Sequence, residues 1–147
     1  MASSRRRTAV RWSALGLALV FLALQFVPVH RVNPPVKLDV DAPGKVAAIL
    51  RRACYDCHSH ETRWPWYSHV APLSWWIADH VEHGRADLNF SQWPMFDFVE
   101  QGMALEDIEE QIHKGEMPLK NYLILHPEAR LSKEDREALL DWARSRP

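Results

Sequence analysis

An apolar run near the N-terminus is the first feature of the hydrophobic pattern. It extends from Trp12 to about Val29 and is interrupted mainly by Ser13, Gln25 and Pro28. A helix rises about 1.5 Å per residue, so about eighteen residues are enough to cross the hydrocarbon core of a bilayer. The run therefore predicts one transmembrane helix.

The rest of the chain has the periodicity of amphipathic helices. Apolar residues recur at three- and four-residue spacing in four further segments. The first two predicted helices are residues 43–53 and residues 72–83, the second with a stop at Gly84. The third is residues 104–114, with Gly115 as C-cap. The last begins after the N-cap Ser132 and has Leu139 and Trp142 on its buried face. The sequence contains no strand-like alternation, hairpin turn signal or internal repeat. The expected fold class is all-α, a small helical domain preceded by one N-terminal transmembrane helix.

Charge and proline placement divide the chain into four parts. They are a cytoplasmic tail (residues 1–11), a transmembrane anchor (12–29), a proline-containing spacer (30–42) and a helical domain (43–147). Four arginines precede the apolar run, whereas only Arg31 and Lys37 follow it closely. Positive charge marks the cytoplasmic side of a membrane segment, so the helical domain is expected outside the cytoplasm.

A cleaved signal peptide is the alternative to an anchor. Such peptides end in a small-residue site of the A-x-A type. The exit from the apolar run instead reads ALQFVPV at positions 23–29, with bulky residues at the expected positions. The sequence favours an uncleaved, single-pass anchor.

Composition argues against a nucleic-acid partner and narrows the use of the cysteines. The formal net charge is -1 and the pI is near 6.7, so the chain lacks the basic face that phosphate backbones require. It has two cysteines, Cys54 and Cys57, too few for a disulfide-rich scaffold. The pair must be interpreted from its neighbours.

The two cysteines belong to the segment Cys54-Tyr55-Asp56-Cys57-His58, which fits the c-type haem attachment pattern. Two thiols three residues apart reach neighbouring positions on one edge of a porphyrin, and the next residue projects under the ring toward the iron. Covalent attachment keeps haem in a domain too small to enclose it completely. The expected cofactor is one haem c, attached at Cys54 and Cys57, with His58 as the proximal iron ligand.

Three other uses of the cysteine pair compete with haem attachment. A thioredoxin-type redox dithiol lies at a strand-to-helix junction, for which the sequence gives no signal. Zinc would need two more ligands, for which His60 and His69 are available, but closed zinc sites normally draw them from a second regularly spaced pair. A disulfide across so short a loop contributes little stability. Haem attachment is favoured over all three.

Met117 is the predicted distal iron ligand. It lies in the segment KGEMP just past a predicted helix end, where a loop can present a thioether to the open side of the haem. Ordinary packing is the alternative role for Met117, and His113 or His126 would give a bis-histidine centre in its place. Met95 and Met103 are expected in the core.

Aromatic residues gather just after the cysteines. Trp64 and Tyr67, with their aromatic neighbours, are expected to form a wall of the haem pocket, because flat rings pack well on a porphyrin. A plain core role is equally open for them. Arg63 is placed to pair with a haem propionate, although a solvated surface position is favoured.

Several short motifs along the chain match a known pattern. They are QFVP (25–28), NPP (33–35), CYDCHS (54–59), ETRWPWY (61–67), NFS (89–91), GEMP (115–118), Tyr122 and LHPEA (125–129). With these motifs the chain resembles the bacterial haem-binding domain family of cytochrome c-like proteins over nearly its whole length. The resemblance implies a small exported c-type haem domain on a membrane anchor, with Cys54, Cys57 and His58 matching the attachment motif.

Electron transfer is the expected function. The domain would lie on the periplasmic side of the bacterial inner membrane, bound to haem, anchored in the bilayer and serving an unknown redox protein partner. A redox carrier is favoured over an enzyme. The alternatives are a sensor or peroxidase-like protein whose distal iron site is open, and a dithiol oxidoreductase that binds no haem.

Overall fold

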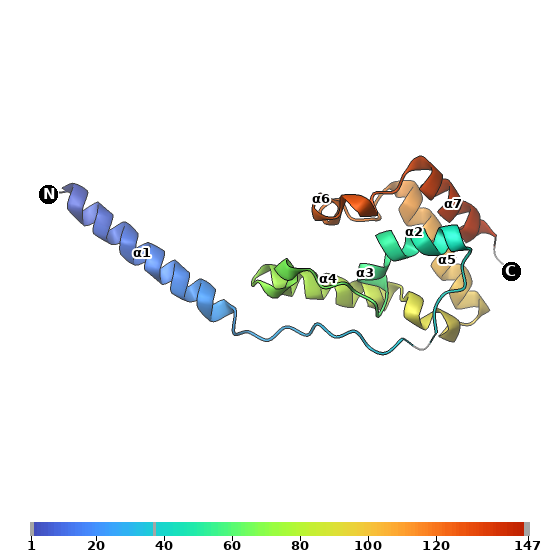
Figure 1. Cartoon of the computed structure of the whole chain (residues 1–147), viewed down its shortest axis with the longest axis horizontal. Coiled ribbons are helices and arrows are strands. Elements are labelled where there is room, and N and C mark those ends of the chain that lie inside the picture. The colour runs from blue at the N-terminus through green and yellow to red at the C-terminus, as the bar shows by residue number, and fades with distance from the viewer. Residues whose placement is uncertain (1, 37, 146–147) are drawn as a thin grey trace. The chain divides into compact units, whose positions relative to one another are not determined.

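Helices are the only regular elements in residues 2–36 and 38–145, the part of the chain that the computed structural model describes. In chain order they are α1 (Ala2–Leu24), α2 (Gly44–Ala53), α3 (Tyr55–His58), the 3-10 helix η1 (Trp66–His69), α4 (Leu73–Asp87), η2 (Phe90–Met95), α5 (Phe98–Lys114), α6 (Tyr122–Leu125), η3 (Pro127–Ala129) and α7 (Lys133–Arg144) (Figure 1). The predicted all-α class is confirmed.

The chain divides into two compact units. The first joins the N-terminal segment up to Arg31 with Trp64–Asp79, and the second joins Val32–Arg63 with the chain from His80 onward. Helix α4 begins in the first unit and ends in the second.

Helix α1 starts earlier and ends earlier than the anchor predicted at residues 12–29. It ends at Leu24, because Pro28 has no N–H to donate and disfavours helical geometry at the residue before it. Its segment Arg5–Leu24 is long and apolar enough to cross a membrane, and none of it is buried in the protein. Membrane anchors and N-terminal signal sequences share these properties.

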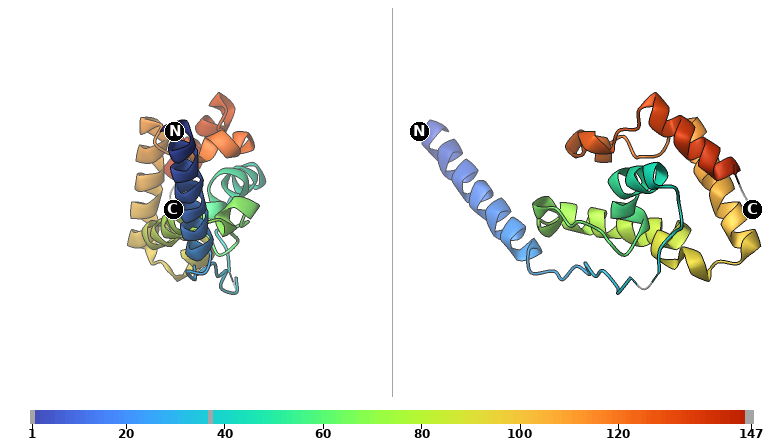
Figure 2. Two further views of the ribbon diagram at one scale, coloured as in Figure 1. Left: turned by 90° about the vertical axis from the view of Figure 1, so that its left-hand side faces the viewer. Right: turned by 45° about the vertical axis from the view of Figure 1, so that its right-hand side comes forward.

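The core of the second unit is built from α2, α5 and α7, with α5 and α7 packed side by side (Figure 2). An aromatic stack supports it. Phe90, which is 1 % exposed, stacks on Tyr55 with ring centroids 5.2 Å apart, and Trp93 lies 6.2 Å from Phe90 and 6.0 Å from Trp142. This stack connects the segment of the two cysteines to the C-terminal helix.

Helix α5 begins six residues before the predicted start at residue 104. A capping box starts it: the Glu100 N–H donates to Asp97 Oδ1 (2.9 Å) and the Asp97 N–H donates to Glu100 Oε2 (2.8 Å). Its first turns expose apolar side chains, so the periodic core pattern missed them. The expectation that Met95 and Met103 are core residues is wrong, because they are 77 % and 61 % exposed.

Both predicted caps of the later helices are confirmed. Gly115 ends α5 in the left-handed region with φ of 66°, where glycine carries no Cβ penalty. Ser132 Oγ accepts from the Asp135 N–H (3.1 Å) at the start of α7. On the predicted buried face of α7, Leu139 is 1 % exposed and Trp142 is partly buried.

The helix predicted at residues 72–83 was expected to stop at Gly84. This stop is wrong, because α4 continues to Asp87. Gly84 serves close packing instead. A Cβ at this position would lie 2.9 Å from the carbonyl oxygen of Cys57, too close for any side chain. The glycine therefore allows the backbone of α4 to approach that of α3.

The predicted spacer (residues 30–42) belongs to the second unit from Val32 onward. The guanidinium of Arg85 donates to the carbonyl of Val32 (2.7 Å) and to Oδ1 of Asn33 (2.8 Å), and Asn33 Nδ2 donates to the carbonyl of Thr62 (2.8 Å). Val40 is buried in the core. Residues 32–40 are thus attached to the domain at both ends.

Candidate functional site

The Cys-x-x-Cys-His segment forms one helical turn that follows α2. The N–H of Cys54 donates to the carbonyl of Leu50 (2.8 Å) and the N–H of His58 donates to the carbonyl of Cys54 (2.9 Å), so the chain stays helical through the motif. Residues three apart on a helix share a face. The turn therefore brings Cys54 and Cys57 within one turn of each other, with His58 directly after them.

The imidazole of His58 is held by the backbone of α4 and the residue after it. Its Nδ1 lies 2.7 Å from the carbonyl oxygen of Gly84 and 3.2 Å from that of Leu88. A carbonyl can only accept, so Nδ1 carries the proton and Nε2 keeps its lone pair. Burial lowers the pKa of His58, against the raising effect of these two carbonyls, and favours the neutral ring. Metal-binding histidines commonly have this arrangement.

A cavity of about 450 Å³ lies in the second unit beside this histidine. Cys54, His58 and Met117 line it together with apolar side chains of α2, α5 and α7, among them Leu50, Ile108, Ile112 and Leu139. Such a volume and a mostly apolar lining with a few polar groups are typical of cofactor sites.

The donors around the cavity fit a haem. A thiol for attachment, an imidazole with a free Nε2 and a thioether border one apolar space, and His and Met are the axial ligands of one class of haem iron. Cys57 is not among the lining residues, although it lies in the same turn as Cys54. The structure therefore brings three of the four residues predicted for haem attachment and ligation to one cavity.

The two alternative histidine ligands lie elsewhere. His113 is exposed on α5, where Nε2 lies 3.0 Å from the guanidinium of Arg144. The ring of His126 stacks on Tyr122 at 4.2 Å and its Nδ1 lies 3.0 Å from Glu128. Neither histidine lines the cavity, so the cavity favours Met117.

Trp64 and Tyr67 belong to the first unit, whereas all lining residues of this cavity belong to the second. Their role as a pocket wall stays a prediction. Tyr67 packs edge-on against Trp66 with centroids 5.8 Å apart.

The zinc alternative gains no support from the residues that the structure describes. Among them, no group of three or more His, Cys, Asp or Glu side chains is placed to hold a metal ion. His60 instead lies with Nε2 2.9 Å from the side-chain amide of Asn89.

Asp56 is the residue of this site that sequence reasoning missed. Its carboxylate accepts from the backbone N–H of Arg63 (3.0 Å), from the Arg63 guanidinium at both oxygens (3.2 and 3.1 Å), and from the hydroxyl of Tyr122 (2.8 Å). Burial and this carboxylate raise the pKa of Tyr122. The contacts tie the haem motif to α6, which follows the Met117 segment. Arg63 is exposed, as the sequence favoured, and its guanidinium also forms a bidentate pair with Asp56.

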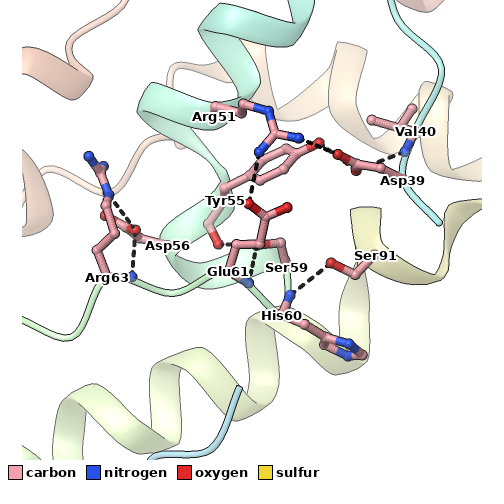
Figure 3. A network of polar contacts seen from close by, with 10 residues as sticks. All are labelled: Asp39, Val40, Arg51, Tyr55, Asp56, Ser59, His60, Glu61, Arg63 and Ser91. Atoms are coloured by element: carbon pink, nitrogen blue, oxygen red, sulfur yellow. Dashed lines mark hydrogen bonds and ion pairs between the residues drawn. The ribbon is translucent and has the colours of Figure 1, made fainter. Parts of the chain in front are cut away.

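The chain after the motif is fixed by a network of short polar contacts (Figure 3). Ser59 Oγ donates to the carbonyl of Tyr55 (2.8 Å) and accepts from the N–H of Glu61 (2.8 Å), while the N–H of His60 donates to Ser91 Oγ (2.9 Å). Ser59 is fully buried, so these bonds satisfy groups that water cannot reach. They hold the end of α3 in place.

We expect Asp56→Ala to destabilise the second unit by about 1.5–3 kcal/mol, the usual contribution of hydrogen bonds to a buried charged group. The change leaves the half-buried Tyr122 hydroxyl and the Arg63 guanidinium without their acceptor. Chemical unfolding of the full chain in detergent, followed by circular dichroism, measures the loss. Glu137→Ala is the control, since its pair with Lys133 is long (3.8 Å) and exposed. Equal stabilities of the two variants would contradict the role of Asp56.

An all-helical domain that places a histidine and a methionine on one apolar cavity, with a cysteine pair beside them, has the features of a haem protein. The family comparison agrees. The sequence profile described as "Haem-binding domain" matches residues 19–145. The chain belongs to this family, and the match supports a haem cofactor. The searches of curated proteins and of solved structures give no match.

Proposed function

We propose that this chain is a membrane-anchored monohaem c-type protein that carries electrons outside the cytoplasm. Haem is attached at Cys54 and Cys57, His58 is the proximal ligand and Met117 is the distal one. The observation that supports this most is the arrangement of His58: Nδ1 is bound to the carbonyl of Gly84, and the ring borders a cavity that Met117 also lines.

The haem would supply one-electron chemistry, and the residues of the chain would tune it. The hydrogen bond from Nδ1 to a backbone carbonyl orients the imidazole of His58 and raises its basicity as a ligand. Apolar side chains such as Ile108 and Leu139 line the cavity and would affect the reduction potential through the local dielectric. A thioether from Met117 raises the potential relative to a second histidine.

The buried thiols argue against dithiol chemistry. Burial raises the pKa of Cys54 to about 12 and that of Cys57 to about 11. Redox-active dithiols have lowered pKa values, because the thiolate is the attacking species. Two buried thiols with raised pKa values are poor nucleophiles, so a free-dithiol oxidoreductase is the weaker proposal.

The membrane anchor is part of the proposal. Segment Arg5–Leu24 of α1 supports it by length and composition, and the arginines before the apolar residues support an N-terminus in the cytoplasm. The haem domain would then lie on the periplasmic side of a bacterial inner membrane, where it could reach a redox protein partner.

Replacing both cysteines is the test of this proposal. We expect the wild-type chain to keep its haem in a denaturing gel and to give the pyridine haemochrome spectrum of a haem with two thioethers. Cys54→Ala/Cys57→Ala should lose all gel-stable haem, since no bond would then join porphyrin to protein. Met95→Ala, at an exposed methionine, is the control and should retain it. A wild-type chain without covalent haem would overturn the proposal and favour the dithiol.

A further inference from the structure

The first unit holds residues 64–79 against the end of α1. These residues, called the aromatic loop below, comprise η1, the turn after it and the start of α4. Gln25 directly follows the last helical residue, Leu24. Its side-chain amide makes two hydrogen bonds to Ala71: Nε2 donates to the carbonyl oxygen (3.3 Å) and Oε1 accepts from the N–H (2.9 Å). Slightly further on, the guanidinium of Arg31 donates to the carbonyl of Ser68 (3.2 Å). Two side chains thus fix residues 68–71 beside the point where the chain leaves the apolar helix.

Large apolar side chains flank this attachment and face solvent. Trp66 is 79 % exposed, Trp76 is 44 % exposed and Leu73 is 39 % exposed. Trp66 and Trp76 each lie five residues from Ala71, so extended chain places them within about 17 Å of it. Indole rings combine an apolar body with one polar N–H, which is why tryptophan is enriched at membrane–water interfaces.

The segment also lacks the charges that would keep it in water. From Trp64 to Asp79 the sequence has no lysine, arginine or glutamate. Apart from one tyrosine, the ionisable side chains in this range are those of His69 and Asp79. A solvent-exposed loop of a soluble domain normally carries more charge. This one has the composition of a segment that meets lipid head groups.

The end of α1 sets the depth of the attachment. The apolar part of α1 ends at Leu24, on the side of the membrane opposite the arginines that precede it. Gln25 then lies at the boundary between hydrocarbon and head groups. Its two hydrogen bonds place Ala71 at the same level.

We propose that residues 64–79 form a second membrane contact, in which Trp66, Leu73 and Trp76 insert into the lipid head-group layer beside the exit of α1. The inference rests on the proposed role of α1 as an anchor. The occupant of the exposed aromatic surface is lipid, because the surface is continuous with the membrane helix through Gln25 and Arg31. The contact would stop the loop from moving freely about the end of the anchor.

Photo-crosslinking to lipid tests the proposal on the full chain. A benzoylphenylalanine photoprobe would replace one residue at a time, at Trp66, Trp76, Phe21 or Glu137, in protein reconstituted into phosphatidylcholine vesicles. Phe21 lies in α1 and reports insertion of the anchor, and Glu137 lies on the charged surface of α7 and reports background. Lipid adducts would be counted by mass spectrometry of the tryptic peptides.

We expect lipid adducts at positions 66 and 76 to approach the yield at position 21 and to exceed the background at position 137 several-fold, since tryptophan side chains at an interface contact lipid. Background yields at 66 and 76 with a high yield at 21 would overturn the loop contact and leave the anchor intact. Crosslinks at 66 to a second copy of the chain would overturn it in favour of a protein interface. Background yield at 21 would overturn the anchor itself.

Removal of the Gln25 contacts is the second arm of the test. Gln25→Leu leaves the apolar residues of α1 unchanged but eliminates both hydrogen bonds to Ala71. The adduct yield at position 66 should fall several-fold while that at Phe21 stays unchanged. An unchanged yield at 66 would show that Gln25 does not place the loop at the membrane, against the proposal.

Discussion

Met117→Ala should convert the haem iron from low-spin to high-spin. The thioether is the one predicted distal ligand that lines the cavity with His58, so its loss leaves the sixth position to water or empty. We expect the ferric spectrum to change accordingly and the reduction potential to fall by on the order of 0.1 V, within the roughly 0.8 V range that axial ligands span. Visible spectra and a redox titration of the detergent-solubilised protein measure both effects.

Met103→Ala is the matched control for this prediction. Met103 is 61 % exposed on α5 and does not line the cavity, so its removal should change neither spectrum nor potential. A low-spin spectrum in Met117→Ala would show that another side chain binds the iron. A high-spin spectrum already present in the wild-type protein would favour the open distal site of a sensor or peroxidase.

Gly84→Ala should destabilise the domain by about 1–3 kcal/mol, the usual cost of overpacking. The added Cβ would lie 2.9 Å from the carbonyl oxygen of Cys57, and a backbone atom cannot turn aside as a flexible side chain can. The carbonyl of Gly84 also accepts from His58 Nδ1, so a shift of α4 would disturb the proximal ligand. Chemical unfolding and the amount of bound haem should both report the change.

Gly102→Ala, on another helix, should have the opposite effect on stability. Gly102 lies within α5, and a Cβ there would meet nothing within 4 Å. Alanine is a better helix former than glycine, so this change should stabilise the protein by about 1 kcal/mol. Helix propensity alone predicts stabilisation by both substitutions. Stabilisation by Gly84→Ala would therefore show that α3 and α4 do not approach as closely as the structure indicates.

The local sequence was enough to predict the helical class and the caps at Gly115 and Ser132, and to single out the Cys-x-x-Cys-His segment as the candidate for haem attachment. Cys54, Cys57 and His58 were found because their chemistry depends on spacing along one turn, and spacing is written in the sequence. Gly115 and Ser132 were placed correctly for a similar reason, since a cap is formed by residues within one turn of it.

The start of α5 was also available from the sequence but was overlooked. Asp97 and Glu100 have the spacing of a capping box. The apolar pattern gave a later start because Phe98 and Val99 are exposed, so they do not continue the core face of Leu105 and Ile108. A cap signal is more reliable than periodicity at a helix end whose side chains leave the core.

By itself, the sequence determined the all-helical class, the apolar N-terminal segment and the candidate segment for haem attachment, because these depend on neighbours within a few residues. Tertiary structure decided which groups meet. It gave His58 Nδ1 its acceptor on α4, brought Met117 to the same cavity as His58, and joined Asp56 to Tyr122 across 66 positions. Gly84 shows the physical reason most clearly: the sequence suggested a helix stop, whereas the packing of α4 on Cys57 requires a residue without a Cβ.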